Sequence, residues 1–302
     1  RLDDEILKLV NQRAAIAREI GGVKNGLAYR PEREAQVLER MRAANPGPLD
    51  ADGVMQLFVE IMSVCRALEA PLSVAYLGPR GTFSEAAAAR HFGAAAQTVP
   101  CGAIDEVFRK VEAGQVSYGV VPVENSTEGA IGRTLDLLLG TPLNICGEIV
   151  LPVHHCLMSR AGAARFIKKI YSHAQSLAQC HEWLSQNFPR AERIPVVSNS
   201  EAARLASLEK ATAAIAAKPA AALYDLKLVA ENIEDEPTNT TRFLVLGKQG
   251  VAPSGRDKTS MVMSAKNRPG AVHALLTPLA VNGVSMTKLE SRPSRTGMQP
   301  TS

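Results

Sequence analysis

The stretch SVAYLG at residues 73–78 is the first of several short apolar runs that decide the fold of this chain. Apolar runs of this length that alternate with helical patterns are typical of an α/β domain with buried, mostly parallel strands. We therefore predict an α/β domain over residues 73–247. The later runs are YGVVPV (118–123), KKIYSH (168–173), IPVVSN (194–199), TAAIAA (212–217) and RFLVLG (242–247), and helical patterns cover 84–91, 103–113, 129–139 and 174–187.

Upstream of residue 73 the sequence carries only helical patterns. In the first, Leu2, Ile6 and Leu9 recur at helical spacing, and the second begins at Pro31, a residue favoured at the first position of a helix. A third follows the helix-breaking stretch NPGPLDADG. Three helices of this length bury little apolar surface alone, so we expect residues 1–70 to form an all-α domain that dimerises.

A linker, GKQGVAPSGRDK (247–258), separates the α/β domain from a last segment. There we predict a strand at TSMVMSA (259–265), a turn, a helix over 271–280 and a strand at VSMTKLESRP (284–293). A βαβ unit of this size cannot bury its own faces, so we expect residues 258–302 to be a partial α+β module.

The composition excludes several classes of protein. Of the 302 residues, 46% are hydrophobic and 21% are charged, as in an ordinary globular protein. The net charge of +4 is spread over interspersed acids and bases, which speaks against nucleic-acid binding and allows a small anionic substrate. Because no apolar run is long enough to span a bilayer and no export signal is evident, we expect a cytoplasmic protein without a membrane partner.

Five cysteines, odd in number and without a CxxC pair, indicate reduced and buried thiols rather than disulfides. The adjacent His154, His155 and Cys156 could suggest a metal site. Neighbouring side chains on a strand point to opposite faces, however, and no second cluster has zinc-ligand spacing. We therefore predict no metal site. The cysteines are Cys65, Cys101, Cys146, Cys156 and Cys180.

Cations on the first helical pattern suggest a binding role. Arg13 and Lys24 are spaced so that both point to one side of the helix, with apolar residues between them. Cys65 and Glu69 lie four residues apart at the end of the third pattern. A solvated basic edge is the plain alternative, but a carboxyl placed near two cations favours a site.

Three segments resemble the all-helical class of chorismate mutase: LDDEILKLVNQRAAIA (2–17), IGGVK (20–24) and YRPEREAQVLERM (29–41). The resemblance implies an intertwined dimer whose pocket clamps the two carboxylates of chorismate while charge grows on the breaking ether oxygen. In this family Lys24 would donate a hydrogen bond to that oxygen. The implied pocket residues are Arg13, Lys24, Arg33, Glu34, Cys65 and Glu69.

Glu69 stands where some relatives have glutamine. A carboxylate beside the ether oxygen would repel the developing charge, so we expect Glu69 to work protonated, with a pKa raised by burial, and mutase activity to fall as the pH rises. The resemblance also implies a further arginine upstream of Arg1. Without it, the helical segment could serve only as a dimerisation device, and the protein would be a dehydratase alone.

Four motifs of the α/β segment follow the order found in prephenate dehydratases: YLGPRGTFSEAAA (76–88), VPVENSTEGAIGRTLDLL (121–138), SHAQSLAQC (172–180) and NTTRFLVLG (239–247). Together they resemble that family across residues 73–247, which implies a two-lobed α/β domain. Prephenate loses a carboxylate as carbon dioxide and a hydroxyl as water, and its ring becomes aromatic. Neither this reaction nor the mutase rearrangement needs an electron sink or a Lewis acid, so we expect no cofactor.

Polar side chains open several predicted helices directly after strands. Helix openings offer unpaired N–H groups and partial positive charge, which suit the carboxylates of a ligand, although a plain helix cap is the alternative for each. Several openings at one edge of an α/β sheet favour a shared crevice. The candidate substrate-binding residues are Thr82, Ser84, Glu124, Asn125, Ser126, Ser172 and Gln175.

Thr241 and Arg242 lie at the start of a buried apolar run. The resemblance implies that Thr241 hydrogen-bonds or protonates the departing hydroxyl, with Arg242 beside it. Because a threonine hydroxyl is a poor acid, we expect an oriented donor or proton relay. The alternative is that Thr240 and Thr241 satisfy a turn, and that Arg242 pairs with Glu234 or Asp235.

NRPGAVHALL (267–276) and KLESRPS (288–294) resemble the amino-acid-binding ACT module of prephenate dehydratases. The resemblance implies a site for phenylalanine between paired modules and hence feedback inhibition. A surface ion pair between Glu290 and Arg292 is the alternative. The implied site residues are Gly270, Ala271, Glu290, Ser291, Arg292 and Pro293.

We therefore predict a bifunctional enzyme of phenylalanine biosynthesis, which converts chorismate to prephenate and prephenate to phenylpyruvate. We expect a homodimer, with a tetramer as the alternative. A small-molecule receptor is the rival from another class, because two-lobed α/β folds also serve as receptors.

Overall fold

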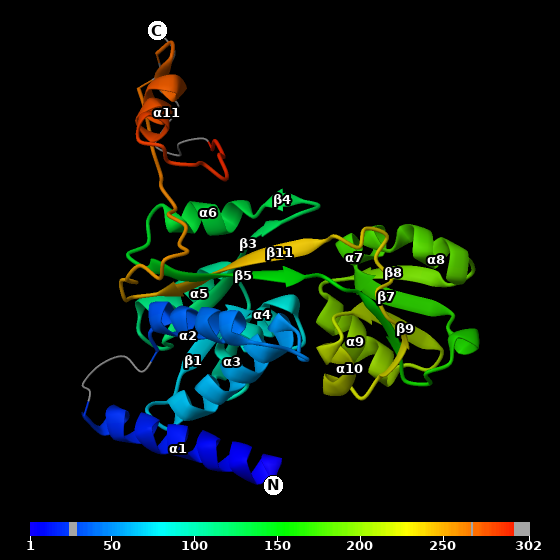
Figure 1. Ribbon diagram of the computed structural model, residues 1–302. Coiled ribbons are helices and arrows are strands. Elements are labelled where there is room, and N and C mark those ends of the chain that lie inside the picture. Colours follow the sequence, from blue (N-terminus) through cyan, green and yellow to red (C-terminus); the bar gives the residue numbers. More distant parts are fainter. Residues whose placement is uncertain (24–28, 267, 293–302) are drawn as a thin grey trace. The chain divides into compact units, whose positions relative to one another are not determined.

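The chain forms two compact units, Arg1–Arg256 and Asp257–Ser302, in a computed structural model that describes residues 1–23, 29–266 and 268–292. The first unit contains three helices followed by two sheets, each with its own helices (Figure 1). None of the helices in the described ranges is long and apolar enough to cross a membrane.

Three helices open the first unit: α1 (Leu2–Val23), α2 (Pro31–Ala44) and α3 (Ala51–Ala67). α2 begins at its proline, and Asp50 caps α3 by accepting a hydrogen bond of 2.7 Å from the amide of Gly53. α3 packs against both α1 and α2. The prediction of a helical segment is confirmed.

The first lobe is a mixed sheet with strand order β2-β1-β3-β11-β5, and β4 pairs with β3. β1 runs parallel to β2 and β3, whereas β11 runs antiparallel to both β3 and β5. The strands are β1 (Ser73–Leu77), β2 (Gln97–Cys101), β3 (Tyr118–Asn125), β4 (Gly129–Ala130), β5 (Asn144–Pro152) and β11 (Thr240–Gly247), and the helices are α4 (Phe83–Phe92), α5 (Ile104–Glu112) and α6 (Gly132–Leu138).

The second lobe is a sheet with strand order β10-β6-β9-β7-β8. β7 runs parallel to β8 and β9, and β6 runs antiparallel to β9 and β10. The strands are β6 (Cys156–Ser159), β7 (Lys169–His173), β8 (Glu192–Val196), β9 (Thr212–Ala216) and β10 (Lys227–Ala230), and the helices are the short 3-10 helix η1 (Ala164–Phe166), α7 (Ala174–Gln179), α8 (His181–Asn187), α9 (Asn199–Leu208) and α10 (Pro219–Leu223).

The α/β prediction is confirmed, but the expectation of mostly parallel strands is wrong. The chain leaves the first sheet through β5 and returns through β11, which pairs with β5 in the antiparallel sense. The two crossing segments lie together, because the amide of Val153 donates to the carbonyl oxygen of Asn239 over 2.8 Å. Short apolar runs in the sequence show that strands are buried, but they do not show the direction of the strands. That direction depends on this double crossing between the lobes.

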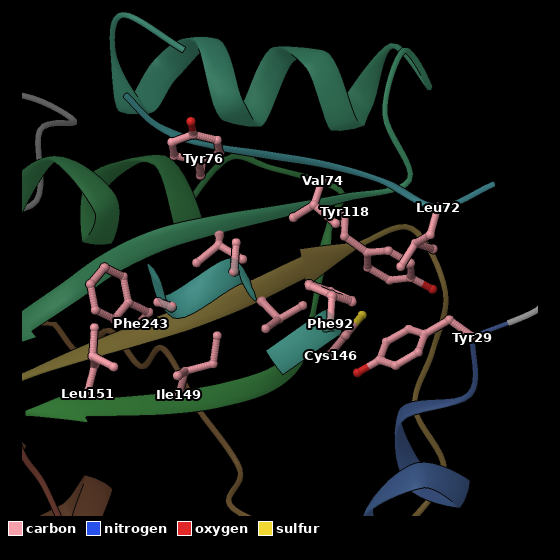
Figure 2. Packing of buried hydrophobic residues seen from close by; sticks show 14 residues of the cluster. Tyr29, Leu72, Val74, Tyr76, Phe92, Tyr118, Cys146, Ile149, Leu151 and Phe243 are labelled. Atoms are coloured by element: carbon pink, nitrogen blue, oxygen red, sulfur yellow. The ribbon is translucent and has the colours of Figure 1, made fainter. Parts of the chain in front are cut away.

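An aromatic cluster joins the helices to the first lobe. Tyr29, which precedes α2, is only 3% exposed and lies among core residues of the sheet and α4 (Figure 2). Its ring centroid lies 5.1 Å from that of Phe92 and 5.0 Å from that of Tyr118. The helical segment is therefore continuous with the core of the α/β domain, which the sequence patterns did not predict.

The second unit contains α11 (Ala271–Val281), which confirms the helix predicted there. The two strands predicted on either side of it are absent among its described residues. A strand gains its backbone hydrogen bonds only from neighbouring strands, and two strands joined by one helix have little surface to bury. The prediction of these two strands is therefore wrong.

Candidate active sites

A cavity of about 520 Å³ lies between the two lobes of the first unit. It is lined on one side by the turn between β1 and α4, including Gly78, Thr82 and Phe83, and on the other by residues of the second lobe, including Gln175 and Asn199. The ends of β1 and β7 thus face one cavity, as expected for a crevice at strand ends. Among the described residues that line it, none comes from β3 or β11.

Thr82 also serves as a helix cap. Its Oγ1 donates to the carbonyl oxygen of Leu77 over 3.2 Å and accepts from the amide of Glu85 over 3.5 Å. Ser84, in the first turn of α4, is 7% exposed and does not line the cavity. The opening of α4 therefore combines the plain capping role with a place at the cavity.

Ser172 lies at the end of β7 and is fully buried. Its hydroxyl contacts Asn199 Oδ1 at 2.9 Å and the carbonyl oxygen of Ile215 at 3.0 Å. Asn199, which lines the cavity, also donates to Ser176 Oγ over 2.8 Å. Ser172 therefore fixes a cavity residue from behind, whereas Gln175 borders the cavity itself.

The turn after β3 and the start of β11 meet through their side chains. Asn125 Nδ2 donates to Thr241 Oγ1 over 2.9 Å and to Asn239 Oδ1 over 3.0 Å. Ser126 Oγ lies 3.4 Å from the same Asn239 oxygen and accepts from the amide of Thr240 over 2.9 Å. The structure thus brings together residues that are more than a hundred positions apart in sequence.

Hydrogen bonds continue from this turn to the second lobe. Thr127 Oγ1 lies 2.5 Å from Asn125 Oδ1, and Gln179 Nε2 donates to Thr127 Oγ1 over 3.1 Å. Gln179 Oε1 lies 2.9 Å from Nε2 of His155, whose ring centroid is 5.7 Å from that of Phe83 at the cavity. Burial lowers the pKa of His155. The sequence analysis did not select Gln179 or His155 for the dehydratase site: Gln179 lies within the third motif, and His155 was considered only as a metal ligand.

Arg242 pairs with two carboxylates across the sheet. It contacts Glu124 at 3.0 Å and Glu148 at 3.1 Å. The alternative partners were wrong, since Glu234 holds the backbone amide of His155 and Asp235 accepts from the first amides of α8. Register places Arg242 opposite Glu124 on the neighbouring strand, so β pairing sets this contact.

A second group of charged residues lies where the three helices meet. Glu34 on α2 forms an ion pair with Arg66 on α3, and the charges of Arg13 and Glu69 also act on it. Burial raises the pKa of Glu34, although Arg66 and Arg13 oppose this shift. Glu69 also lies against Gly21 of α1, because a Cβ on Gly21 would be 3.0 Å from its Cα.

The other predicted mutase residues differ in their exposure. Cys65 is buried at 2% exposure, and Arg33 is exposed on α2. Lys24 lies outside the described residues. Arg66, which the sequence analysis did not select, is 4% exposed. Its position beside Cys65, as a charged residue in a largely apolar helix, was the sequence signal that could have indicated a buried role.

In the second unit Gly270 precedes α11 with a φ of +76°, a conformation that favours glycine, and Ala271 begins the helix. Arg292 lies 3.7 Å from Glu290, which matches the surface ion pair kept as the alternative. Ser291 is exposed, and Pro293 lies outside the described residues.

All five cysteines are free and buried. Across the described ranges, no cluster of histidine, cysteine and carboxylate side chains could hold a metal ion. His154 instead pairs with Glu234 over 2.7 Å.

Two family descriptions match this chain. Residues 74–251 match prephenate dehydratase, and residues 1–70 match chorismate mutase type II. The chain belongs to the bifunctional chorismate mutase/prephenate dehydratase family. It is 55% identical over 298 residues to the bifunctional chorismate mutase/prephenate dehydratase of Neisseria gonorrhoeae, covering 97% of this chain and 82% of the relative.

The bifunctional enzyme of Pseudomonas aeruginosa is 52% identical over 305 residues, covering 98% of this chain and 84% of the relative. Among solved structures, the prephenate dehydratase of Arthrobacter aurescens in complex with L-Phe superposes with a TM-score of 0.67 at 34% identity, covering 75% of this chain and 77% of that one. This bifunctional enzyme therefore has chorismate mutase and prephenate dehydratase activities, and its substrates are chorismate and prephenate. These matches exclude the two alternative functions, a small-molecule receptor and a dehydratase without mutase activity.

Proposed function

We propose that Thr241 directs its hydroxyl proton to the departing hydroxyl of prephenate. The support is the hydrogen bond from Asn125 Nδ2, because Thr241 Oγ1 accepts it and keeps its single proton for another partner. The hydroxyl leaves as water when it gains a proton, and the ring carboxylate leaves as carbon dioxide when its bonding electrons enter the ring. The ring then becomes aromatic, and the proton that Thr241 passes on is replaced from solvent.

Arg242 assists the same step because it forms no ion pair with the carboxylate that is lost. Its charge is compensated by Glu124 and Glu148. A free cation beside the leaving carboxylate would stabilise the substrate more than the transition state, so this compensation favours decarboxylation. Thr82 and Gln175 bind the substrate at the cavity, and Ser126 and Ser172 hold the surrounding backbone and side chains.

For the mutase reaction we assign the cluster of Arg13, Glu34, Cys65 and Glu69, together with Lys24 and Arg33. The support is the proximity of Arg13, Glu69 and Glu34 at the junction of the three helices. Arginine clamps one substrate carboxylate, and Glu69 faces the ether oxygen in its protonated form.

The enzyme forms at least a homodimer through α1. Leu2, Ile6, Leu9 and Ile16 on this helix are all more than half exposed, and apolar surface of this extent calls for a partner. The buried free thiols of all five cysteines suit a reducing compartment, and we place the enzyme in the cytoplasm.

We also propose that phenylalanine inhibits the enzyme through residues 258–302, as an ACT module with Gly270, Ala271 and the segment from Glu290 to Pro293 at its site. The support is the L-Phe complex of the Arthrobacter aurescens dehydratase and the helix at Ala271–Val281. The mutase and dehydratase domains occupy residues 1–70 and 73–247.

One experiment tests these assignments together. The purified chain receives chorismate or prephenate, and phenylpyruvate is followed with and without phenylalanine. We expect product from both substrates, and less of it with phenylalanine. Product from prephenate alone would contradict the mutase assignment, and insensitivity to phenylalanine would contradict the ACT assignment.

A further inference from the structure

Arg66 on α3 makes three contacts although it is nearly fully buried. Its Nη1 pairs with the carboxylate of Glu34, and its Nη2 donates to the carbonyl oxygen of Phe92 over 2.6 Å. Its Cζ lies 5.0 Å from the centroid of the Tyr29 ring. A guanidinium at 4% exposure needs such partners, because an unpaired charge is costly to bury.

One of these contacts, to the carbonyl oxygen of Phe92, belongs to the first lobe of the dehydratase domain, and Tyr29, which precedes α2, packs into the core of that lobe. Phe92 ends α4 and is fully buried, and the Tyr29 hydroxyl lies 2.7 Å from Nε2 of His91 on the same helix. Tyr29 packs on Tyr118 of β3 as well (Figure 2). The guanidinium is thus anchored in the lobe at one end and binds Glu34 at the other.

α3 is docked on the lobe beside this anchor. Glu60 accepts from the amide of Ala94 over 3.0 Å, and Ser63 Oγ accepts from the amide of Ala95 over 3.3 Å. A Cβ on Gly93, which has a φ of +74°, would lie 2.4 Å from Cβ of Ser63, so the helix and the end of α4 are in close contact. Arg66 therefore extends from a helix that is hydrogen-bonded to the lobe.

We infer that Arg66 is a positioning residue of the mutase site: it holds the Glu34 carboxylate in place from an anchor in the dehydratase lobe. This inference rests on the proposed place of Glu34 in the mutase pocket. A charge-assisted hydrogen bond of this kind fixes both the orientation and the ionisation of a carboxylate. The mutase reaction then depends on the lobe that carries the other activity.

The charges that act on Glu34 come from α1, from α3 and from Glu69, which follows α3. Arg66 and Arg13 favour its ionised form, whereas burial and Glu69 oppose it. Burial and the Glu34 charge together keep the Tyr29 hydroxyl protonated by raising its pKa. Of the favourable charges, Arg66 acts most strongly, so its loss would let Glu34 take up a proton at higher pH.

The test compares Arg66→Gln, Arg66→Lys, Glu34→Gln and the double variant Arg66→Gln/Glu34→Gln in the full chain. We expect Arg66→Gln to lower kcat/KM on chorismate about tenfold or more, the scale of a lost hydrogen bond to a charged group, and Arg66→Lys to recover part of it. The acid limb of the mutase pH profile should move to higher pH in Arg66→Gln. The double variant should be no worse than Glu34→Gln, because both substitutions break one interaction.

Dehydratase activity on prephenate controls for folding in every variant. We expect it to stay within about twofold, since the three Arg66 partners named above are not among the described residues that line the cavity between the lobes. Tyr29→Leu tests the anchor without touching Glu34 and should lower mutase kcat/KM about threefold, the scale of a lost cation–π contact. Unchanged mutase kinetics and pH profile in Arg66→Gln, or losses that add in the double variant, would overturn the inference. Full mutase activity in Glu34→Gln would instead remove Glu34 from the proposed mutase site, and the inference with it.

Discussion

The junction between α3 and the first lobe is built from charged and titratable side chains, whereas the network around Thr241 is built from amides and hydroxyls. At the junction, Arg66 pairs with Glu34, and the ring of Tyr29 contacts both Arg66 and His91. At the strand edge, Asn125 joins Thr241 to its neighbours through neutral hydrogen bonds.

The two chemistries explain the difference. The mutase binds a dianion and stabilises charge that moves within it, so fixed charges near the substrate are useful. The dehydratase must release a carboxylate and pass on a proton, so unpaired charge would hold the substrate back. Neutral donors with fixed directions supply orientation without that cost.

The largest effect should follow from Thr241→Val. Valine keeps the shape of the side chain and removes its hydroxyl, so we expect the dehydratase kcat to fall about 100-fold or more, the scale of a positioned proton-transfer group. Mutase activity on chorismate, measured in the same preparation, should be unchanged. A dehydratase rate near that of the unaltered chain would show that another residue serves the departing hydroxyl.

A smaller effect should follow from His155→Phe. Because Gln179 Nε2 donates to Thr127, its Oε1 needs a donor, and His155 Nε2 supplies it. Phenylalanine keeps the ring contact with Phe83 and removes the donor, so we expect a loss of about tenfold in dehydratase kcat.

The neighbouring variant His154→Gln is the matched control. This histidine is half exposed and, within the described ranges, pairs with Glu234 alone, so its substitution should leave the dehydratase rate unchanged. Equal losses in both variants would mean that the segment, rather than the donor, matters.

The pH dependence of stability separates the two titratable groups at the junction. Burial lowers the pKa of His91 from 6.5 to about 4, so between these values the unfolded chain binds a proton that the folded chain does not. His91 therefore makes the free energy of unfolding fall as the pH drops from 6.5 towards 4. In His91→Gln this part of the decline should disappear from urea titrations.

Glu34 acts in the opposite sense. Its pKa is raised above 4.5 in the folded chain, so the folded chain keeps the proton longer and stability falls as the pH rises above 4.5. Glu34→Gln should remove that fall, which makes the rise of stability with pH steeper between 4.5 and 6.5. Identical slopes in both variants would contradict the assignment of opposite signs.

The smallest effect should follow from Ser172→Ala. The Ser172 hydroxyl is fully buried and bonds to Asn199 and Ile215, so its loss should cost about 1 kcal/mol of stability, as for a neutral hydrogen bond. Dehydratase KM should change less than about threefold, because the hydroxyl supports a cavity residue from behind. A large rise in KM would show direct contact with prephenate.

Much of the fold and part of the sites could be predicted from the sequence. The helices up to Ala67 and the strands at Ser73, Tyr118 and Thr240 follow from local apolar patterns. The antiparallel return of β11 could not be predicted, because strand direction depends on how the chain crosses between lobes. The two strands expected beside α11 are absent among the described residues, because a sequence pattern by itself supplies no neighbouring strand for the backbone to bond to.

The sequence by itself determined which side chains are available for chemistry. These are the side chains of the ordered dehydratase motifs, those of the helical mutase pattern, and Thr241 near the start of a buried strand. Only the tertiary structure decided their partners. It paired Arg242 with Glu124 and Glu148, Asn125 with Thr241, and Arg66 with Glu34. The physical reason is that side-chain hydrogen bonds and ion pairs act over a few ångströms, and residues far apart in sequence reach that distance only after the lobes and helices have packed.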